Sequence, residues 1–167
     1  MQNYFSIFDL KTDFEIDKIK LEQQYKEQIA QFHPDKFANS TADEKSQALQ
    51  NTSLINTAYN TLKSDLNRAI YLLELNNIYP FDEKDTQMDA EFLITQIELR
   101  EKLETLKNET EVEEFIDKIN PLEKQHIQNI KESFKMNNLE NAKKNVRELR
   151  FYQQLILEAN KLLDELL

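Results

Sequence analysis

The chain contains no cysteine and no glycine, and these two absences narrow both its chemistry and its fold. Without cysteine, the 167 residues cannot form disulfides, use a thiol nucleophile, or bind zinc or an iron–sulfur cluster through thiolates. Without glycine, the chain lacks the residue that tight β-turns most often use to reach positive φ angles. Only three prolines are present, so the sequence favours an all-α fold with polar loops between helices.

Positive charge is scarce relative to negative charge. The chain has 21 Lys and Arg against 31 Asp and Glu, which gives a formal net charge of −10. Such a surface repels nucleic-acid phosphates and anionic membranes, so we expect neither as a partner. The sequence also lacks a long apolar run, a basic apolar leader and a Gly-rich phosphate-binding loop. We therefore expect a cytoplasmic protein with no cofactor and no membrane span.

Apolar residues recur at intervals of three and four, which predicts a succession of amphipathic helices. We expect helices over about 16–32, 42–63, 67–73, 90–106, 112–134 and 139–167, with Asp13 as a cap for the first. Two Asn and one Pro interrupt the pattern between Asn76 and Pro80, which predicts a linker between domains at 1–76 and 80–167. Pro121 lies inside the helix over 112–134 and should kink or divide it.

His33, Pro34 and Asp35 lie where the first long helix must stop. The residue before a proline is pushed out of the helical region, so His33 leaves the helix. A loop between two packed helices would hold its imidazole and the Asp35 carboxylate outward, where they suit a basic partner surface. The residues alone also allow a simple helix stop in which Asp35 caps and His33 is solvated.

In this context the triplet resembles the loop of the J-domain, in which two antiparallel helices flank a His-Pro-Asp sequence. The segment His33–Phe37, together with residues 66–73, 92–101 and 148–151, is similar more specifically to the HscB co-chaperone family. The similarity extends from Tyr4 to about Leu166. It implies an N-terminal J-domain, built as an antiparallel helical hairpin, followed by a C-terminal three-helix bundle.

The resemblance also implies a function in iron–sulfur cluster assembly. In that family the J-domain binds an HscA-like chaperone of the DnaK type and stimulates its ATPase, and the bundle binds the scaffold protein IscU. The chaperone-binding residues implied for this chain are His33, Pro34, Asp35, Lys36 and Lys26. The helix that carries Lys26 also carries Glu22 and Glu27, so we expect weak charge steering and a dedicated chaperone.

Helical geometry indicates part of the client-binding face. On a wheel of about 100° per residue, Phe92 belongs to the core stripe of its helix, whereas Leu93 and Ile97 lie outside it. Phe151 lies opposite the core stripe of the last helix. It is therefore exposed, unless other helices cover the last helix on two sides and bury it. The resemblance favours exposure. The scaffold-binding residues that the resemblance implies are Leu93, Ile94, Ile97, Glu98, Arg100, Glu101, Arg150 and Phe151.

Two other functions remain open from the residues. A generic J-domain protein could use its bundle to bind another client or to self-associate, with Leu93 and Ile97 in the self-interface. An enzyme could use His33 and Asp35 in acid–base catalysis, but neighbouring residues on an exposed turn form no pocket, and we expect no enzymatic activity. His126 lies on an apolar stripe, which favours a buried or half-buried histidine over a metal ligand.

Overall fold

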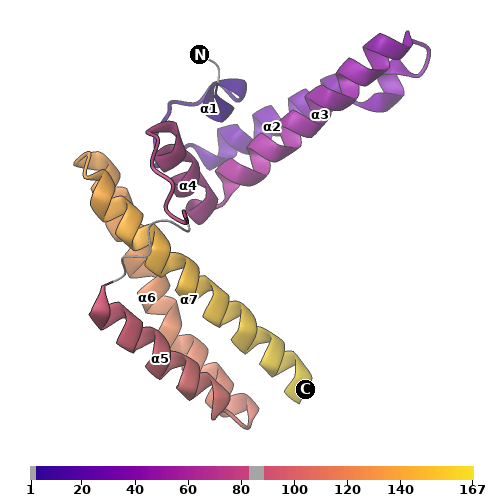
Figure 1. The fold of residues 1–167 in the computed structure, drawn as a ribbon. Helices are drawn as coiled ribbons and strands as arrows, with labels where there is room; N and C mark the ends of the chain where they lie inside the picture. Colours follow the sequence, from indigo (N-terminus) through magenta and orange to yellow (C-terminus); the bar gives the residue numbers. More distant parts are fainter. Residues whose placement is uncertain (1–2, 83–88) are drawn as a thin grey trace. The chain divides into compact units, whose positions relative to one another are not determined.

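The structure, a computed structural model, describes residues 3–82 and 89–167. Throughout these two ranges the chain forms helices and turns and contains no β-strand, which confirms the predicted all-α fold (Figure 1). The chain separates into two compact units, Met1–Leu72 and Leu73–Leu167.

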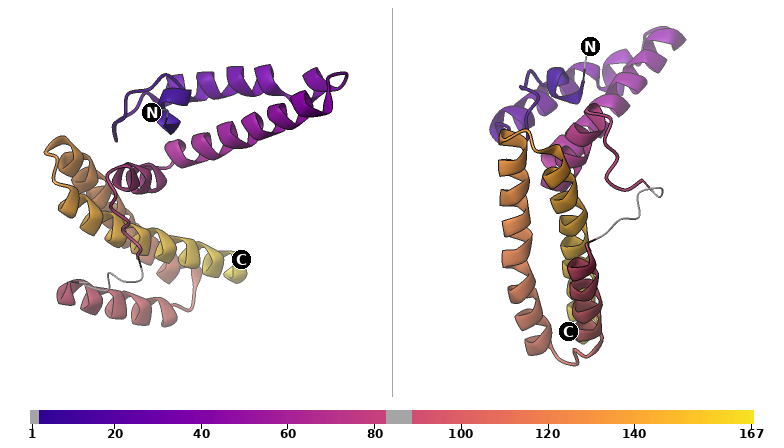
Figure 2. Two further views of the ribbon diagram at one scale, coloured as in Figure 1. Left: turned by 45° about the horizontal axis from the view of Figure 1, so that its top comes forward. Right: turned by 60° about the vertical axis from the view of Figure 1, so that its left-hand side comes forward.

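The first unit is built around a helical hairpin. After the short helix α1 (Tyr4–Ile7) come α2 (Lys18–Phe32), a 3-10 turn (Pro34–Phe37), α3 (Ala42–Lys63) and α4 (Asp65–Leu75). Helices α2 and α3 run side by side in opposite directions (Figures 1 and 2). Between them, the ring of Tyr25 stacks on that of Tyr59 at 3.9 Å, and its hydroxyl donates to Asn56 Oδ1 at 2.6 Å. The predicted hairpin is therefore confirmed.

The start of α2 differs from the prediction. Asp13 does not cap it; the helix begins after Asp17, whose side chain accepts from the Lys20 backbone N–H at 3.0 Å. Asp13 instead accepts from the backbone N–H of Phe14 at 2.7 Å, and the Phe14 side chain is buried. Burying this ring holds the chain in a non-helical path until Asp17.

A buried arginine joins this path to the end of the hairpin. Arg68 donates from Nε to the Phe14 carbonyl at 2.6 Å and from Nη1 to the Leu62 carbonyl at 2.7 Å. Its Nη2 donates to Asp65 Oδ1 at 2.6 Å, and its guanidinium lies 4.7 Å from the Phe14 ring centroid. These partners compensate a charge that is only 3% exposed, which would otherwise be costly to bury.

The second unit contains the predicted three long helices. They are α5 (Ala90–Glu104), α6 (Glu109–Lys135) and α7 (Leu139–Leu166); α6 and α7 pack along one another, and α5 lies beside α7 (Figures 1 and 2). The sequence predicts that Pro121 kinks or divides this helix; α6 continues through it as one helix, so of these two alternatives the division is wrong. The core cluster of this unit consists of Phe92, Leu106, Val112, Phe115, Ile119, Phe151, Tyr152, Leu155 and Ala159.

Aspartate and asparagine take the turn positions that glycine usually fills. Asp9, Asn77 and Asn137 have φ angles of 54°, 60° and 52°. The residue that follows each of them donates a hydrogen bond from its backbone N–H to the carbonyl five residues earlier, at 2.8–2.9 Å. This bond ends the helix. Short polar side chains tolerate this left-handed conformation better than others do, so helices can end sharply in a chain without glycine.

Candidate functional site

The His-Pro-Asp loop is a short, internally bonded turn. His33 ends α2 with an extended conformation (φ −57°, ψ 134°), and Pro34 begins the 3-10 turn. The backbone N–H of Lys36 donates to the His33 carbonyl at 3.0 Å, and His33 Nδ1 accepts from the backbone N–H of Asp35 at 3.2 Å. The imidazole therefore caps the turn, which is the role that the simple helix-stop interpretation gave to Asp35.

This cap leaves the carboxylate of Asp35 directed to solvent. The Asp35 side chain is 93% exposed, and its Oδ2 lies 3.5 Å from His33 Nδ1. In this arrangement His33 Nδ1 accepts the backbone N–H, and its separation from Oδ2 is too long for a good hydrogen bond. The loop thus offers a carboxylate on a fixed turn to a cationic partner.

The neighbouring helices support the loop but add little positive charge. The hydroxyl of Thr52 on α3 donates to the Phe32 carbonyl at 3.1 Å and so ties the end of α2 to the hairpin. Lys26, predicted to bind the chaperone, pairs with Glu22 at 3.1 Å, and both side chains are exposed. This pairing offsets the charge of Lys26 locally, in keeping with the weak steering expected from the sequence.

A second exposed region lies on α5. Leu93, Ile94 and Ile97 are 43%, 56% and 59% exposed, and we call these three residues the α5 strip. Phe92 faces the core at 6% exposure, which confirms that Leu93 and Ile97 lie outside the core stripe. Exposed apolar side chains gathered on one helix are typical of a protein-binding surface.

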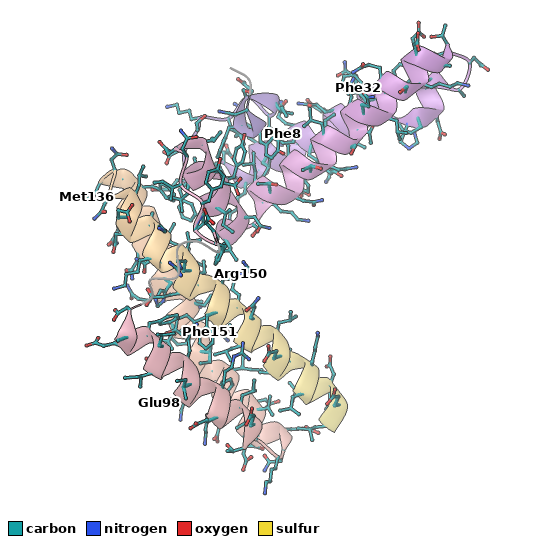
Figure 3. The ribbon with its side chains drawn as sticks, viewed as in Figure 1. Phe8, Phe32, Glu98, Met136, Arg150 and Phe151 are labelled. Atoms are coloured by element: carbon teal, nitrogen blue, oxygen red, sulfur yellow. The ribbon has the colours of Figure 1, made fainter. Side chains whose placement is uncertain are left out.

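Phe151 is buried, so the predicted exposure of this ring is wrong. It is 6% exposed and packs edge-on against Phe92, with ring centroids 5.6 Å apart. Figure 3 shows it between α5 and α7, whereas Glu98 lies on the outer side of α5. The reason is that α7 is covered by α6 on one side and by α5 on the other, so apolar residues on both faces are enclosed.

Beside the α5 strip, the surface between α5 and α7 contains an open hollow of about 480 Å³. We call it the arginine hollow; its lining residues are Phe81, Gln96, Ile97, Arg100, Arg147, Arg150, Phe151 and Gln154. Arg100 donates to Glu158 at 2.9 Å and lies 5.5 Å from the Phe151 ring centroid.

The hollow unites some of the predicted scaffold-binding residues and adds others. Ile97, Arg100, Arg150 and Phe151 line it, whereas the remaining predicted residues are exposed on α5 outside its lining. The sequence interpretation missed Phe81 and Arg147. A helical wheel relates positions within one helix, and it cannot show that a residue preceding α5, such as Phe81, folds back onto α7.

His126 is half-buried on α6, as the sequence predicts. Its Nδ1 lies 2.7 Å from the Leu122 carbonyl, and its Nε2 lies 3.8 Å from Glu148 Oε2 on α7. Burial raises the pKa of Glu148, although His126 and Lys144 act to lower it, and burial together with Glu148 raises the pKa of Tyr152. Across residues 3–82 and 89–167, no three His, Asp or Glu side chains gather as metal ligands would. The His126 ring lies 5.0 Å from that of Tyr152, so these side chains pack between α6 and α7.

No helix within the described ranges is both long and apolar enough to cross a lipid bilayer.

Comparison with known proteins links the two regions to one family. Residues 3–71 match the DnaJ domain, and residues 88–160 match a family described as the HSCB C-terminal oligomerisation domain. The co-chaperone protein HscB homolog of Neisseria meningitidis is 37% identical over 93% of this chain and 95% of its own length. The human iron–sulfur cluster co-chaperone protein HscB is 30% identical over 92% of this chain and 66% of its own.

Solved structures agree over nearly the whole chain. Chaperone HscB from Vibrio cholerae superposes with a TM-score of 0.89 at 32% identity, and the match covers 99% of this chain and 100% of that one. The crystal structure of human co-chaperone protein HscB gives a TM-score of 0.92 at 29% identity, covering 96% and 82%. These similar proteins are described as chaperones or co-chaperones, and none of their names denotes an enzyme.

Proposed function

The chain belongs to the HscB family of J-domain co-chaperones, and from this premise we propose that it delivers an IscU-like scaffold protein to an HscA-like chaperone and stimulates that chaperone's ATPase. The module at residues 1–76 would bind the chaperone, and the module at residues 80–167 would bind the scaffold. The observation that carries the proposal is the presence of an exposed carboxylate on a fixed loop in one unit and an exposed apolar strip in the other.

In the first module, Asp35 meets a cationic group of the chaperone. His33 and Pro34 shape the turn, and Lys36 and Lys26 flank it. The side chains of His33 and Asp35 are 51% and 93% exposed, so this loop acts as a contact surface, and the hydrolysis of ATP takes place in the chaperone. Stimulation then arises from tighter binding to the hydrolysis-competent state of the chaperone, which is an allosteric effect.

In the second module, the α5 strip supplies apolar contact and the surrounding charges set orientation. Apolar contact at the centre of an interface usually contributes most of the binding energy, whereas charges at the rim chiefly affect specificity. Phe151 supports this surface from beneath, as one wall of the arginine hollow. The proposed scaffold-binding residues are Leu93, Ile94, Ile97, Glu98, Arg100, Glu101, Arg150 and Phe151.

The test is the ATPase rate of an HscA-like chaperone with and without the scaffold. We expect Asp35→Asn to abolish stimulation and to leave scaffold binding intact, whereas Asp117→Asn, an equal charge change at an exposed site on α6, should have no effect. Leu93→Ala/Ile97→Ala should retain basal stimulation but lose the additional stimulation by scaffold. An Asp35→Asn protein that still stimulates fully would contradict the proposal.

This experiment needs a control variant and a check that each variant stays folded. Leu122→Ala/Met136→Ala removes exposed apolar groups elsewhere on the second unit and should leave the response to scaffold unchanged. Phe151→Ala is unsuitable as a binding variant, since emptying a buried aromatic site costs about 3–5 kcal/mol of stability. Circular dichroism of each variant would verify that the helices persist.

A J-domain protein with another client, or one that self-associates, would behave differently. The name of the family that matches residues 88–160 contains the word oligomerisation, which makes a self-interface on the α5 strip the specific alternative. Sedimentation would then show dimers that Leu93→Ala/Ile97→Ala dissociates, and the scaffold would not change the ATPase rate. That result would preserve the J-domain assignment and reject scaffold delivery.

A further inference from the structure

The arginine hollow has a charge opposite to that of the chain as a whole. Three arginines and two glutamines line it, and none of the lining residues within 3–82 and 89–167 is acidic, although acidic residues outnumber basic ones by 31 to 21 in the sequence. A local concentration of positive charge on a strongly acidic surface attracts a negatively charged group of a partner.

Aromatic rings hold two of the guanidinium groups in place. Arg150 lies 4.3 Å from the ring centroid of Phe81, and Arg100 lies 5.5 Å from that of Phe151. A guanidinium that lies over a ring keeps its N–H donors in the plane of the group, where they can still pair with a carboxylate. Within the described parts of the chain, Arg100 pairs with Glu158, and Arg150 lies over the ring of Phe81.

The hollow is continuous with the apolar surface of α5. Ile97 belongs both to the α5 strip and to the hollow lining, and it is 59% exposed. A partner that covers the strip at Ile97 therefore also reaches the edge of the hollow. A ligand suited to both surfaces carries an apolar side chain beside an acidic one.

We propose that the arginine hollow is a carboxylate-binding subsite, in which Arg147 and Arg150, with Phe81 as the positioning residue, receive an acidic side chain of the scaffold protein bound on the α5 strip. This inference rests on the proposed scaffold-binding function. It adds two contacting or positioning residues, Phe81 and Arg147, and specifies the chemical class of the group that they receive. A phosphate backbone fits poorly because the net charge of −10 repels it.

The experiment measures binding of the full chain to purified IscU-like scaffold by titration calorimetry at about 50 and 500 mM NaCl, concentrations that change screening strongly. Arg147→Gln/Arg150→Gln should weaken binding about tenfold at low salt, and the difference from the unmodified protein should shrink at high salt. Lys102→Gln/Lys161→Gln removes the same charge from exposed sites outside the lining and should weaken binding much less.

A second variant tests the positioning role of Phe81. Phe81→Ala should lose part of the same salt-sensitive affinity, and Phe81→Tyr, which keeps a ring beneath Arg150, should restore it. Circular dichroism and thermal melts of both variants check that α5 and α7 remain folded.

The outcomes separate this inference from the function on which it rests. Equal binding by the arginine and lysine double variants, or a loss that is the same at both salt concentrations, overturns the carboxylate subsite while scaffold binding stands. Failure of the unmodified chain to bind the scaffold overturns the proposed function, and the subsite with it.

Discussion

At the scale of single residues, the His-Pro-Asp loop divides its tasks between two side chains. His33 uses Nδ1 to cap the turn that Pro34 begins, and the carboxylate of Asp35 stays directed to solvent. The imidazole thus determines the shape of the loop, and the carboxylate remains available to a partner. Asparagine at position 35 would keep the shape and remove the charge, which is why it is the informative substitution.

The Glu148 carboxyl gives a residue-level prediction about pH. Burial raises its pKa, so the fold disfavours its ionised form. The resulting loss of folding stability is absent below about pH 4.5, where the carboxyl is protonated in both the folded and the unfolded chain. It reaches its full size above the raised pKa of the folded state. Glu148→Gln should therefore gain stability relative to the unmodified protein as the pH rises from about 4 to 8, by on the order of 1 kcal/mol or less.

Thermal melts at the two pH values measure this difference. Glu113→Gln, a change at an exposed position of α6, serves as the control and should show no such trend. A Glu148→Gln protein that is less stable than the unmodified one at pH 8 would mean that the contact with His126 outweighs the cost of burial.

At the scale of elements, α6 shows that a proline need not end a helix. Pro121 lies in the middle of Glu109–Lys135, and the helix continues on both sides because its apolar face packs against α7. The proline still removes one backbone hydrogen bond and crowds the preceding turn. We expect Pro121→Ala to raise the free energy of unfolding by about 1–3 kcal/mol, measured by guanidinium titration.

Pro121→Gly provides the comparison for this change. It restores the backbone N–H as alanine does, but glycine costs about 1 kcal/mol more than alanine in a helix interior. Its stability should therefore fall below that of Pro121→Ala. A loss of stability in Pro121→Ala would show that the packing of α6 on α7 depends on a bend at the proline.

At the scale of the whole molecule, net charge is the dominant electrostatic feature. A charge of −10 destabilises a compact state through self-repulsion, which added salt screens. We expect the melting temperature at pH 7 to rise by a few degrees between about 10 and 300 mM NaCl. Near pH 4.8, the isoelectric point of the sequence, the same addition should have little effect. A fall at pH 7 would show that ion pairs such as Arg100–Glu158 contribute more than the general repulsion.

The sequence by itself determined the features that depend on neighbours along the chain. Apolar periodicity predicted the long helices, and Pro34 predicted the end of the first of them. The exposure of Leu93 and Ile97 also followed, because a helical wheel needs only the direction of one core stripe. The family resemblance then connected the loop and the bundle, and the comparisons confirm that family.

Only the tertiary structure decided the features that depend on a second element. Phe151 is buried because α5 and α6 cover α7 from two sides, and periodicity within α7 cannot reveal which faces have neighbours. Arg68 is buried for a similar reason. One of its partners, Phe14, is distant in the sequence, and the other, Leu62, belongs to the preceding helix. The arginine hollow likewise joins Phe81 to residues of α5 and α7, and such a surface exists only once the helices are packed.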